Sequence, residues 1–339
     1  MSHSAATRPT RRVLLPASVD PAPPPLAGSV HEFSGRTMGT TWRVRLVAAV
    51  ALPRAPVQRA IQGALDDVVD QMSPWEAHSD LTRFNRAAPA TWQVLPDAFF
   101  EVLANAREVA ERSDGAFDPT AGALVDAWGF GPAAPRGVPG DAALLQARAR
   151  AGWRRLALDP ARRSAHQPGG LALDLSAIAK GFGVDLVARR LAALGFESHL
   201  VEVGGELRGS GLKPDGQPWW VRLEHPDAAS AEPETLLALH GLSVATSGDY
   251  RRWFEHAGRR YSHTIDPRDG LPIRHGLASV TVIHGQCMLA DAWSTALTVL
   301  GPVDGPALAN RLGLAARFVV RHDTHVEERR SATFERLLH

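Results

Sequence analysis

The sequence predicts an α+β fold in which helices and strands occupy separate stretches of the chain. Amphipathic helical patterns fill much of the first half, at residues 56–72 and 97–112, and short strand patterns follow one another after residue 200. Regular strand–helix–strand units, which a doubly wound parallel sheet requires, are few. With 339 residues and 45% hydrophobic content, the chain can bury a sizeable core in one large domain or two ordinary ones.

Residues 1–30 are expected to form a disordered cytoplasmic arm. Arg11-Arg12, followed by three apolar residues, is similar to a twin-arginine export signal, but Pro16 and the prolines within residues 21–25 interrupt the apolar region. An atypical export signal with a periplasmic location is the alternative. No later stretch approaches the ~18 to 20 uninterrupted apolar residues that span a bilayer. The folded domain is expected to cover residues 31–339.

Two helices dominate the first half of that domain. Residues 42–46 alternate like a half-buried strand, and Pro56 then opens a helix. Ser79 begins a short element, and a strongly amphipathic helix runs from Asp97 to Arg112 and stops at Ser113-Asp114-Gly115. The buried faces are expected to be Val57, Ile61, Ala64, Leu65, Val68 and Met72 in the first long helix, and Phe99, Val102, Leu103, Ala106, Val109 and Ala110 in the second.

Strands are expected to dominate the second half. Residues 170–175 predict a strand, with Ser176 as the N-cap of a helix that Gly195 ends. Its buried stripe is expected to be Val184, Val187, Leu191 and Leu194. Further strands are expected at 200–203, 219–223, 242–246 and 278–283, and a helix at 288–300 that Gly301-Pro302 ends. Glycine-containing loops at 115–122 and 128–132 and a surface excursion at 132–139 precede these strands.

Charge and cysteine content exclude several classes of function. Thirty-seven basic and 36 acidic residues leave a formal charge of +1, so no global field attracts nucleic acid or an anionic membrane. Cys287 is the one cysteine, which excludes an intrachain disulfide and Cys-rich zinc sites. Its apolar neighbour Met288 favours a small core residue over a nucleophile.

Asp291 and Thr295 are four residues apart, so on a helix they share one face and can offer oxygen ligands to one cation. Such ligands favour Mg²⁺ or Ca²⁺. The alternative is a surface aspartate beside a threonine bonded to its own helix. The apolar residues around them argue against that alternative, because a buried unpaired carboxylate is costly.

Asp174 and Lys180 flank the expected start of a helix, whose free N–H groups attract anions. A phosphate or pyrophosphate would suit this corner, although the Walker pattern is absent. An N-capped helix with an exposed lysine is the alternative.

His263 is expected in a strand between Ser262 and Thr264, with Asp266 at the strand's end. An imidazole is the natural group to take a proton from a hydroxyl nucleophile at neutral pH. A structural histidine is the alternative. Together with Asp291 and Thr295, this segment predicts phosphoryl chemistry on a metal-bound ligand.

Taken in order, the motifs resemble the ApbE family of FAD:protein FMN transferases. The resemblance covers roughly residues 31–310, and an ordered set of motifs is more specific than any one of them. The motifs are MGT at 38–40, GAFDPT at 115–120, WGFG at 128–131, DLSAIAKG at 174–181, EVGGE at 202–206, ATSGDY at 245–250, SHTIDP at 262–267 and MLADA at 288–292.

The resemblance implies a single ApbE-type, T-fold-like domain with largely antiparallel sheets flanked by helices. It also implies transfer of FMN from FAD to a threonine or serine of an acceptor flavoprotein, with Mg²⁺ on the pyrophosphate and release of AMP. The implied roles are His263 as the base, Asp291, Thr295 and the main-chain carbonyl of Ala177 as metal ligands, and Met38, Trp75, Ala116, Phe117, Asp118, Asp174, Lys180 and Ile265 as the FAD site.

The sequence departs from the family pattern in two places. Trp75 stands where the family often has tyrosine, which keeps a stacking surface but loses the hydroxyl. The usual lipoprotein or secretory leader is not evident, which is why a cytoplasmic location is expected. Two other functions fit the same motifs: a Mg²⁺-dependent FAD pyrophosphatase, and a flavin-binding protein without chemistry.

Overall fold

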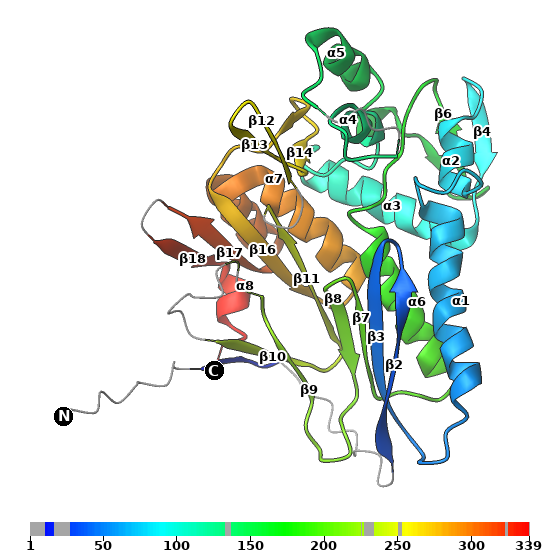
Figure 1. Cartoon of the computed structure of the whole chain (residues 1–339), viewed down its shortest axis with the longest axis vertical. Coiled ribbons are helices and arrows are strands. Elements are labelled where there is room, and N and C mark those ends of the chain that lie inside the picture. The colour runs from blue at the N-terminus through cyan, green and yellow to red at the C-terminus, as the bar shows by residue number, and fades with distance from the viewer. Residues whose placement is uncertain are drawn as a thin grey trace, which may run out of the picture.

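The computed structural model describes residues 11–16, 28–132, 137–224, 226, 234–249, 253–322 and 325–338. Its centre is an eight-stranded sheet in which every neighbouring pair is antiparallel. Helices pack along the sheet (Figure 1). In spatial order the strands are β18 (Val326–Arg330), β17 (Ala315–Arg321), β16 (Leu277–His284), β11 (Leu242–Gly248), β8 (Glu206–Ser210), β7 (His199–Val203), β3 (Thr40–Ala48) and β2 (Ser29–Thr37).

Smaller sheets surround the central one. The first contains β1 (Arg12–Leu14), β10 (Thr235–Leu239) and β9 (Trp219–Arg222), and the second contains β4 (Thr91–Val94), β6 (Ser164–Gln167) and β5 (Leu158–Asp159). Two hairpins complete the set: β12 (Trp253–His256) with β13 (Arg259–Ser262), and β14 (Ile265–Asp266) with β15 (Leu271–Pro272). The predicted α+β class with largely antiparallel sheets is confirmed.

The helices are α1 (Arg54–Met72), α2 (Asp80–Asn85), α3 (Asp97–Arg112), α4 (Gly122–Ala127), α5 (Asp141–Ala149), α6 (Ala179–Ala193), α7 (Cys287–Leu312) and α8 (Ala332–Glu335), with a 3₁₀ turn at Trp153–Arg155. The predicted buried faces of α1 and α3 are confirmed residue by residue. The predicted stop of α3 is also confirmed, because Gly115 N–H donates back to the Ala110 carbonyl. Within the described residues, no helix is both long and apolar enough to span a membrane.

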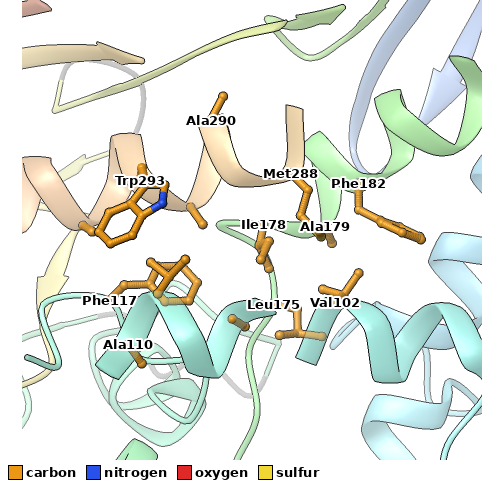
Figure 2. Close-up of a cluster of buried hydrophobic side chains, with 14 of the residues drawn as sticks. Val102, Ala110, Phe117, Leu175, Ile178, Ala179, Phe182, Met288, Ala290 and Trp293 are labelled. Atoms are coloured by element: carbon orange, nitrogen blue, oxygen red, sulfur yellow. The ribbon is translucent and has the colours of Figure 1, made fainter. Parts of the chain in front are cut away.

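The two faces of the central sheet bury different clusters. Successive residues of one strand alternate between faces, so Leu46 of β3 packs towards α1 and α6 whereas Val47 packs towards β9 and β10. A third cluster lies between α3, α7 and the sheet (Figure 2), where Phe117 and Trp293 meet. The start of α6, from Ile178 to Phe182, is embedded in this cluster.

The N-terminal segment corrects one expectation. Within residues 1–30, expected to be disordered, residues 12–14 form β1, parallel to β10, and β2 already begins at Ser29. Leu14 is fully buried, and Leu15 N–H donates to the Leu337 carbonyl at 2.9 Å. Burial of Leu14 against the C-terminal residues stabilises this strand. Residues 1–10 and 17–27 of the arm, like residues 133–136 of the surface excursion and Tyr250, lie outside the described residues.

Helix α1 covers the open edge of the sheet with polar side chains. Its residues 54, 58 and 62 lie one turn apart on one face, and the carbonyls of alternate residues of β2 point towards them. An uncovered edge strand invites pairing with another chain. The donated hydrogen bonds run from Arg54 to the Glu32 carbonyl, from Gln58 to Ser34 at 3.1 Å and from Gln62 to Arg36 at 3.4 Å.

The strand expected at residues 170–175 does not form. Two side-chain amides, one from half-buried Asn85 and one from fully buried Gln167, bind this segment instead. Asn85 bonds both backbone groups of Leu173, and Gln167 bonds both those of Leu171. The backbone groups are therefore satisfied without a ladder, apart from one bridge between Ala172 and Ala121.

Helix α6 also differs from the expectation at both ends. It begins at Ala179, so Ser176 is not its N-cap; the Ser176 N–H instead donates to Asp174 Oδ1 at 2.7 Å, in a turn before the helix. Leu194 is 53% exposed, because the helix ends there and the chain turns at Gly195, whose φ is +86°.

Helix α7 is interrupted at Gly301, where the sequence predicted its end, and a second helical segment follows. Gly301 has φ 79° and ψ −169°, and the chain resumes helical geometry at Pro302. Proline suits the first position of a helix because its missing N–H has no intrahelical partner there. Helix α5 was not predicted; of its nine residues only Ala147 is buried, so its pattern is weak.

Candidate active site

The start of α6, the first residue of β8 and the first turns of α7 bring together an ammonium group and two buried carboxylates. Lys180 Nζ lies 2.7 Å from Glu206 Oε1 and 3.5 Å from both carboxylate oxygens of Asp291. The side chains of Glu206 and Asp291 are 3% and 5% exposed, and that of Lys180 is 28% exposed. Buried carboxylates are stable only when paired. The alternative of an exposed lysine at an N-capped helix is therefore wrong.

Gly181 allows the two helices to touch. Its N–H donates to Asp291 Oδ2 at 3.0 Å, and a Cβ atom at this position would lie 2.4 Å from the Cys287 carbonyl oxygen. Only glycine fits such a contact. The Asp291 carboxylate is consequently held against the N-terminus of α6, where free N–H groups stabilise negative charge.

Thr295 lies one turn after Asp291, and its hydroxyl is bonded outside its own helix. Thr295 Oγ1 lies 3.2 Å from Ser247 Oγ of β11. By contrast, Ser294 and Thr298 donate to carbonyls of α7 itself. Asp291 is 4% exposed, so the alternative of a surface aspartate beside a threonine bonded to its own helix is wrong.

The donor set fits a hard cation. A carboxylate and a hydroxyl one helical turn apart, with the Ala177 carbonyl just before α6, offer oxygen ligands of the kind that Mg²⁺ and Ca²⁺ prefer. Ala177 is half-buried. Among the described residues, no three His, Cys, Asp or Glu side chains gather in a metal-binding arrangement. A hard-cation site of mixed carboxylate, hydroxyl and carbonyl oxygens does not require three such side chains.

Asp118 is built into the loop that follows α3. It accepts hydrogen bonds from the N–H and hydroxyl of Thr120, at 2.7 and 2.6 Å, and from the Trp153 N–H at 3.0 Å. Burial raises the pKa of Asp118 above its ordinary value, and these hydrogen bonds oppose that shift. The Asp174 N–H donates to the Pro119 carbonyl at 2.9 Å, so the loops that carry both aspartates are adjacent.

Ala116 and Phe117 face inward. They are 1% and 3% exposed, and Phe117 packs against the α7 side chain Trp293 (Figure 2). Their side chains are therefore core, which leaves only their backbone to face a ligand.

Met38 and Trp75, the other residues expected in the FAD site, differ in placement. Met38 occupies the β2–β3 turn with φ +47°, and its Cε would meet a Cβ at Gly183 of α6 at 3.2 Å. Trp75 is 60% exposed, in the segment between α1 and α2. Met38 thus lies against α6, whereas Trp75 presents an open aromatic face at the surface.

His263 does not lie in a strand. It occupies the bend between β13 and β14, and its ring centroid lies 6.3 Å from that of Phe130 in an edge-on arrangement. Phe130 in turn packs against Phe254, which stacks on Tyr261 at 5.2 Å. Asp266 is engaged by Arg268, at 2.9 and 2.7 Å. This aspartate is thus bound to Arg268, and an aromatic cluster forms one side of His263.

A fourth apolar cluster joins loops from distant parts of the sequence. Ile265, 7% exposed, packs with Ala121, Trp128 and Ala172. Trp128 Nε1–H donates to the Gly270 carbonyl at 2.8 Å. The motifs at 128–131 and 262–267 therefore meet in this cluster, and Ala121, directly after the motif at 115–120, belongs to it as well.

Sequence reasoning missed Glu206 and Ser247 as partners of the predicted residues. Both stand in motifs to which the sequence assigned no role, EVGGE at 202–206 and ATSGDY at 245–250, and the one sequence signal was an acid directly after Gly204-Gly205. Cys287 is fully buried, which raises the pKa of its thiol well above the usual value. Its expected place in the core is confirmed.

Comparison with known proteins gives consistent results. The model of the ApbE family matches residues 38–318. A Vibrio cholerae protein named FAD:protein FMN transferase is 38% identical over 314 residues, which cover 92% of this chain and 93% of the relative. One of the same name from Haemophilus influenzae is 36% identical and covers 91% of each chain.

A solved structure is similar over the same extent. The Pseudomonas stutzeri flavinyl transferase ApbE, in its apo form, is 41% identical and superposes with a TM-score of 0.84 over 91% of this chain and 97% of that chain. The family match, the identity of the relatives and this superposition agree with the motifs and the fold: the chain belongs to the ApbE family.

Proposed function

We propose that this protein transfers the FMN part of FAD to the side-chain hydroxyl of a threonine, or a serine, in an acceptor flavoprotein and releases AMP. The observation that carries the proposal is the meeting of Lys180 and Asp291, 3.5 Å apart at the N-terminus of α6. Cation-binding oxygens and anion-binding groups side by side suit a pyrophosphate. The names of the relatives support the same activity.

Asp291, Thr295 and the Ala177 carbonyl would hold a Mg²⁺ ion. When bound, that ion neutralises negative charge on the pyrophosphate oxygens. Lys180 and the N-terminus of α6 would hold the remaining phosphate charge, because the first N–H groups of a helix have no intrahelical partners. Asp174 and Asp118, in adjacent loops, would orient the rest of FAD.

His263 is proposed to take the proton of the acceptor hydroxyl. The acceptor oxygen forms a bond to the FMN-side phosphorus while the phosphoanhydride bond breaks, and AMP leaves with the bridging oxygen. The hydroxyl proton goes to a ring nitrogen of His263. Phe130 lies against one side of this histidine in an edge-on contact, which would limit the positions that its ring adopts.

The test is His263→Ala, assayed with FAD, Mg²⁺ and a threonine-containing acceptor. We expect loss of AMP release and of covalent fluorescence on the acceptor, with FAD binding retained. Added imidazole should restore part of the rate. His166→Ala, which alters a ring tilted against that of Trp92 in β4, is the matched control and should keep full activity. Wild-type transfer by His263→Ala would contradict the base assignment.

The same assay separates the alternatives. Release of FMN and AMP without an acceptor would indicate a pyrophosphatase, and no AMP at any Mg²⁺ concentration would indicate a binding protein. AMP release that requires the acceptor supports transfer. The cytoplasmic location is a separate proposal, which fractionation of cells that produce the protein would test.

A further inference from the structure

Glu206 has no role in the proposed chemistry so far, although its carboxylate is among the most buried in the site. It is the first residue of β8, directly after the Gly204-Gly205 turn, and its side chain is 3% exposed. Its Oε1 accepts a 2.7 Å hydrogen bond from Lys180 Nζ. A carboxylate buried this far is costly without such a partner, so its presence beside the site calls for a function.

The ammonium of Lys180 has two carboxylate neighbours at unequal distances. The contact with Glu206, 2.7 Å, is a strong charge-assisted hydrogen bond. The contacts with the two oxygens of Asp291 are 3.5 Å each, at the limit of hydrogen bonding. Lys180 is therefore bound more closely by Glu206 than by Asp291.

The backbone fixes Glu206 in this place. Gly204 has φ +62° and Gly205 φ +107°, conformations that favour glycine. The Gly204 N–H donates to the Thr41 carbonyl at 3.0 Å, and Val203 pairs with Glu206 in the β7–β8 ladder. The Glu206 carboxylate thus belongs to a rigid hairpin that is bonded to β3. The Lys180 ammonium, by contrast, lies at the end of a flexible side chain.

We infer that Glu206 is a positioning residue: it holds the Lys180 ammonium away from Asp291, so that Asp291 can bind a cation and Lys180 can bind a phosphate. The inference rests on the proposed function. Opposite charges attract more strongly in a low-dielectric site than in water. Without the charge of Glu206, the ammonium would move to Asp291 and compete with the cation for it.

Three variants test this arrangement: Glu206→Gln, Lys180→Met and the double variant. The measurement is the Mg²⁺ concentration that half-saturates FAD binding, followed by quenching of flavin fluorescence without an acceptor. Loss of a group that positions metal-site residues costs about tenfold or more in metal affinity. We expect Glu206→Gln to raise the required Mg²⁺ about tenfold. Lys180→Met should weaken FAD binding without raising the Mg²⁺ requirement.

The double variant decides the mechanism. If Glu206 acts through Lys180, adding Glu206→Gln to Lys180→Met should change the Mg²⁺ requirement by no more than about twofold, because no ammonium remains to compete. An equal tenfold change in both backgrounds would mean that Glu206 attracts the cation by its own charge, and would overturn the inference. No change in Glu206→Gln would overturn it as well.

Two further measurements keep the result interpretable. If Glu206→Gln does not fold, as judged by circular dichroism, Glu206→Asp replaces it. This variant keeps the negative charge but has a shorter side chain. A smaller rise in the Mg²⁺ requirement that disappears in the Lys180→Met background supports the inference. Wild-type protein that binds no FAD with Mg²⁺ would overturn the proposed function and the inference together. Wild-type binding combined with equal changes in both backgrounds would overturn the inference alone.

Discussion

Replacing Gly181 with alanine should force α6 and α7 apart. The added Cβ would lie 2.4 Å from the Cys287 carbonyl oxygen and 2.9 Å from Asp291 Cβ. A backbone carbonyl cannot rotate out of the way, so the helices would have to separate by about 0.6 Å before this contact reaches even the shortest distance that Cβ atoms adopt, 3.0 Å. Overpacking of this kind typically costs ~1–3 kcal/mol.

Gly183→Ala is the matched control, two residues further along the same helix. Its Cβ would meet Met38 Cε at 3.2 Å and Leu65 Cδ2 at 3.3 Å, which are ends of flexible side chains. Both substitutions gain the ~1 kcal/mol by which alanine is a better helix former than glycine, so this gain cancels between them. The difference in their free energies of unfolding reports the helix contact.

We therefore expect Gly181→Ala to be ~1–3 kcal/mol less stable than Gly183→Ala in urea denaturation. Because the Gly181 N–H also binds Asp291 Oδ2, Gly181→Ala should weaken Mg²⁺ binding in calorimetric titration, and Gly183→Ala should not. Equal stability and equal Mg²⁺ affinity of the two variants would refute the argument that the close helix contact builds the site.

Three other predictions follow from the fold. Leu14→Ala should lower the free energy of unfolding by ~2–5 kcal/mol, and half-buried Val13→Ala by less; equal losses in thermal denaturation would contradict the placement of β1. Because burial raises the folded-state pKa of Asp118 above its unfolded value of 3.8, its contribution to stability is fully present below that value and is lost as the pH rises through the folded pKa. Asp118→Asn should lack this loss, so its stability relative to the wild type should increase with pH in urea titrations, and a constant difference would count against the burial argument. Arg54→Ala combined with Gln58→Ala should uncover carbonyls of β2 and promote self-association, measured by light scattering. An unchanged state of association would show that the edge needs no cover.

The sequence predicted the elements whose pattern reflects their own burial. The long helices α1 and α3 each bury one face, and the period of their apolar residues gives that face directly. The segment at 170–175 has an equally apolar pattern, yet it is a buried loop. Its backbone is bonded by Asn85, 88 positions away from Leu173, and by Gln167. No local pattern reports side-chain amides that replace a strand partner.

In the candidate site, too, local features could be predicted from the sequence and contacts between distant residues could not. The spacing of Asp291 and Thr295 is local to one helix, so their shared face could be predicted. The partners of Lys180 could not, because Glu206 is 26 positions away and Asp291 is 111 positions away. His263 was expected in a strand between Ser262 and Thr264, but the chain bends there between two separate hairpins.

The pairing of the two chain ends has a consequence during synthesis. Arg12 of β1 and its partner Glu328 of β18 are 316 positions apart, and Leu14 is buried against the last residues of the chain. At ~5–20 residues per second, the first strand therefore waits roughly 15 to 60 s on the ribosome before its final partners have been made. During that interval the apolar segment around Leu14 is exposed and accessible to any factor that handles nascent chains. It is withdrawn into the fold only after the C-terminal partners of β1, such as Glu328 and Phe334, have been synthesised.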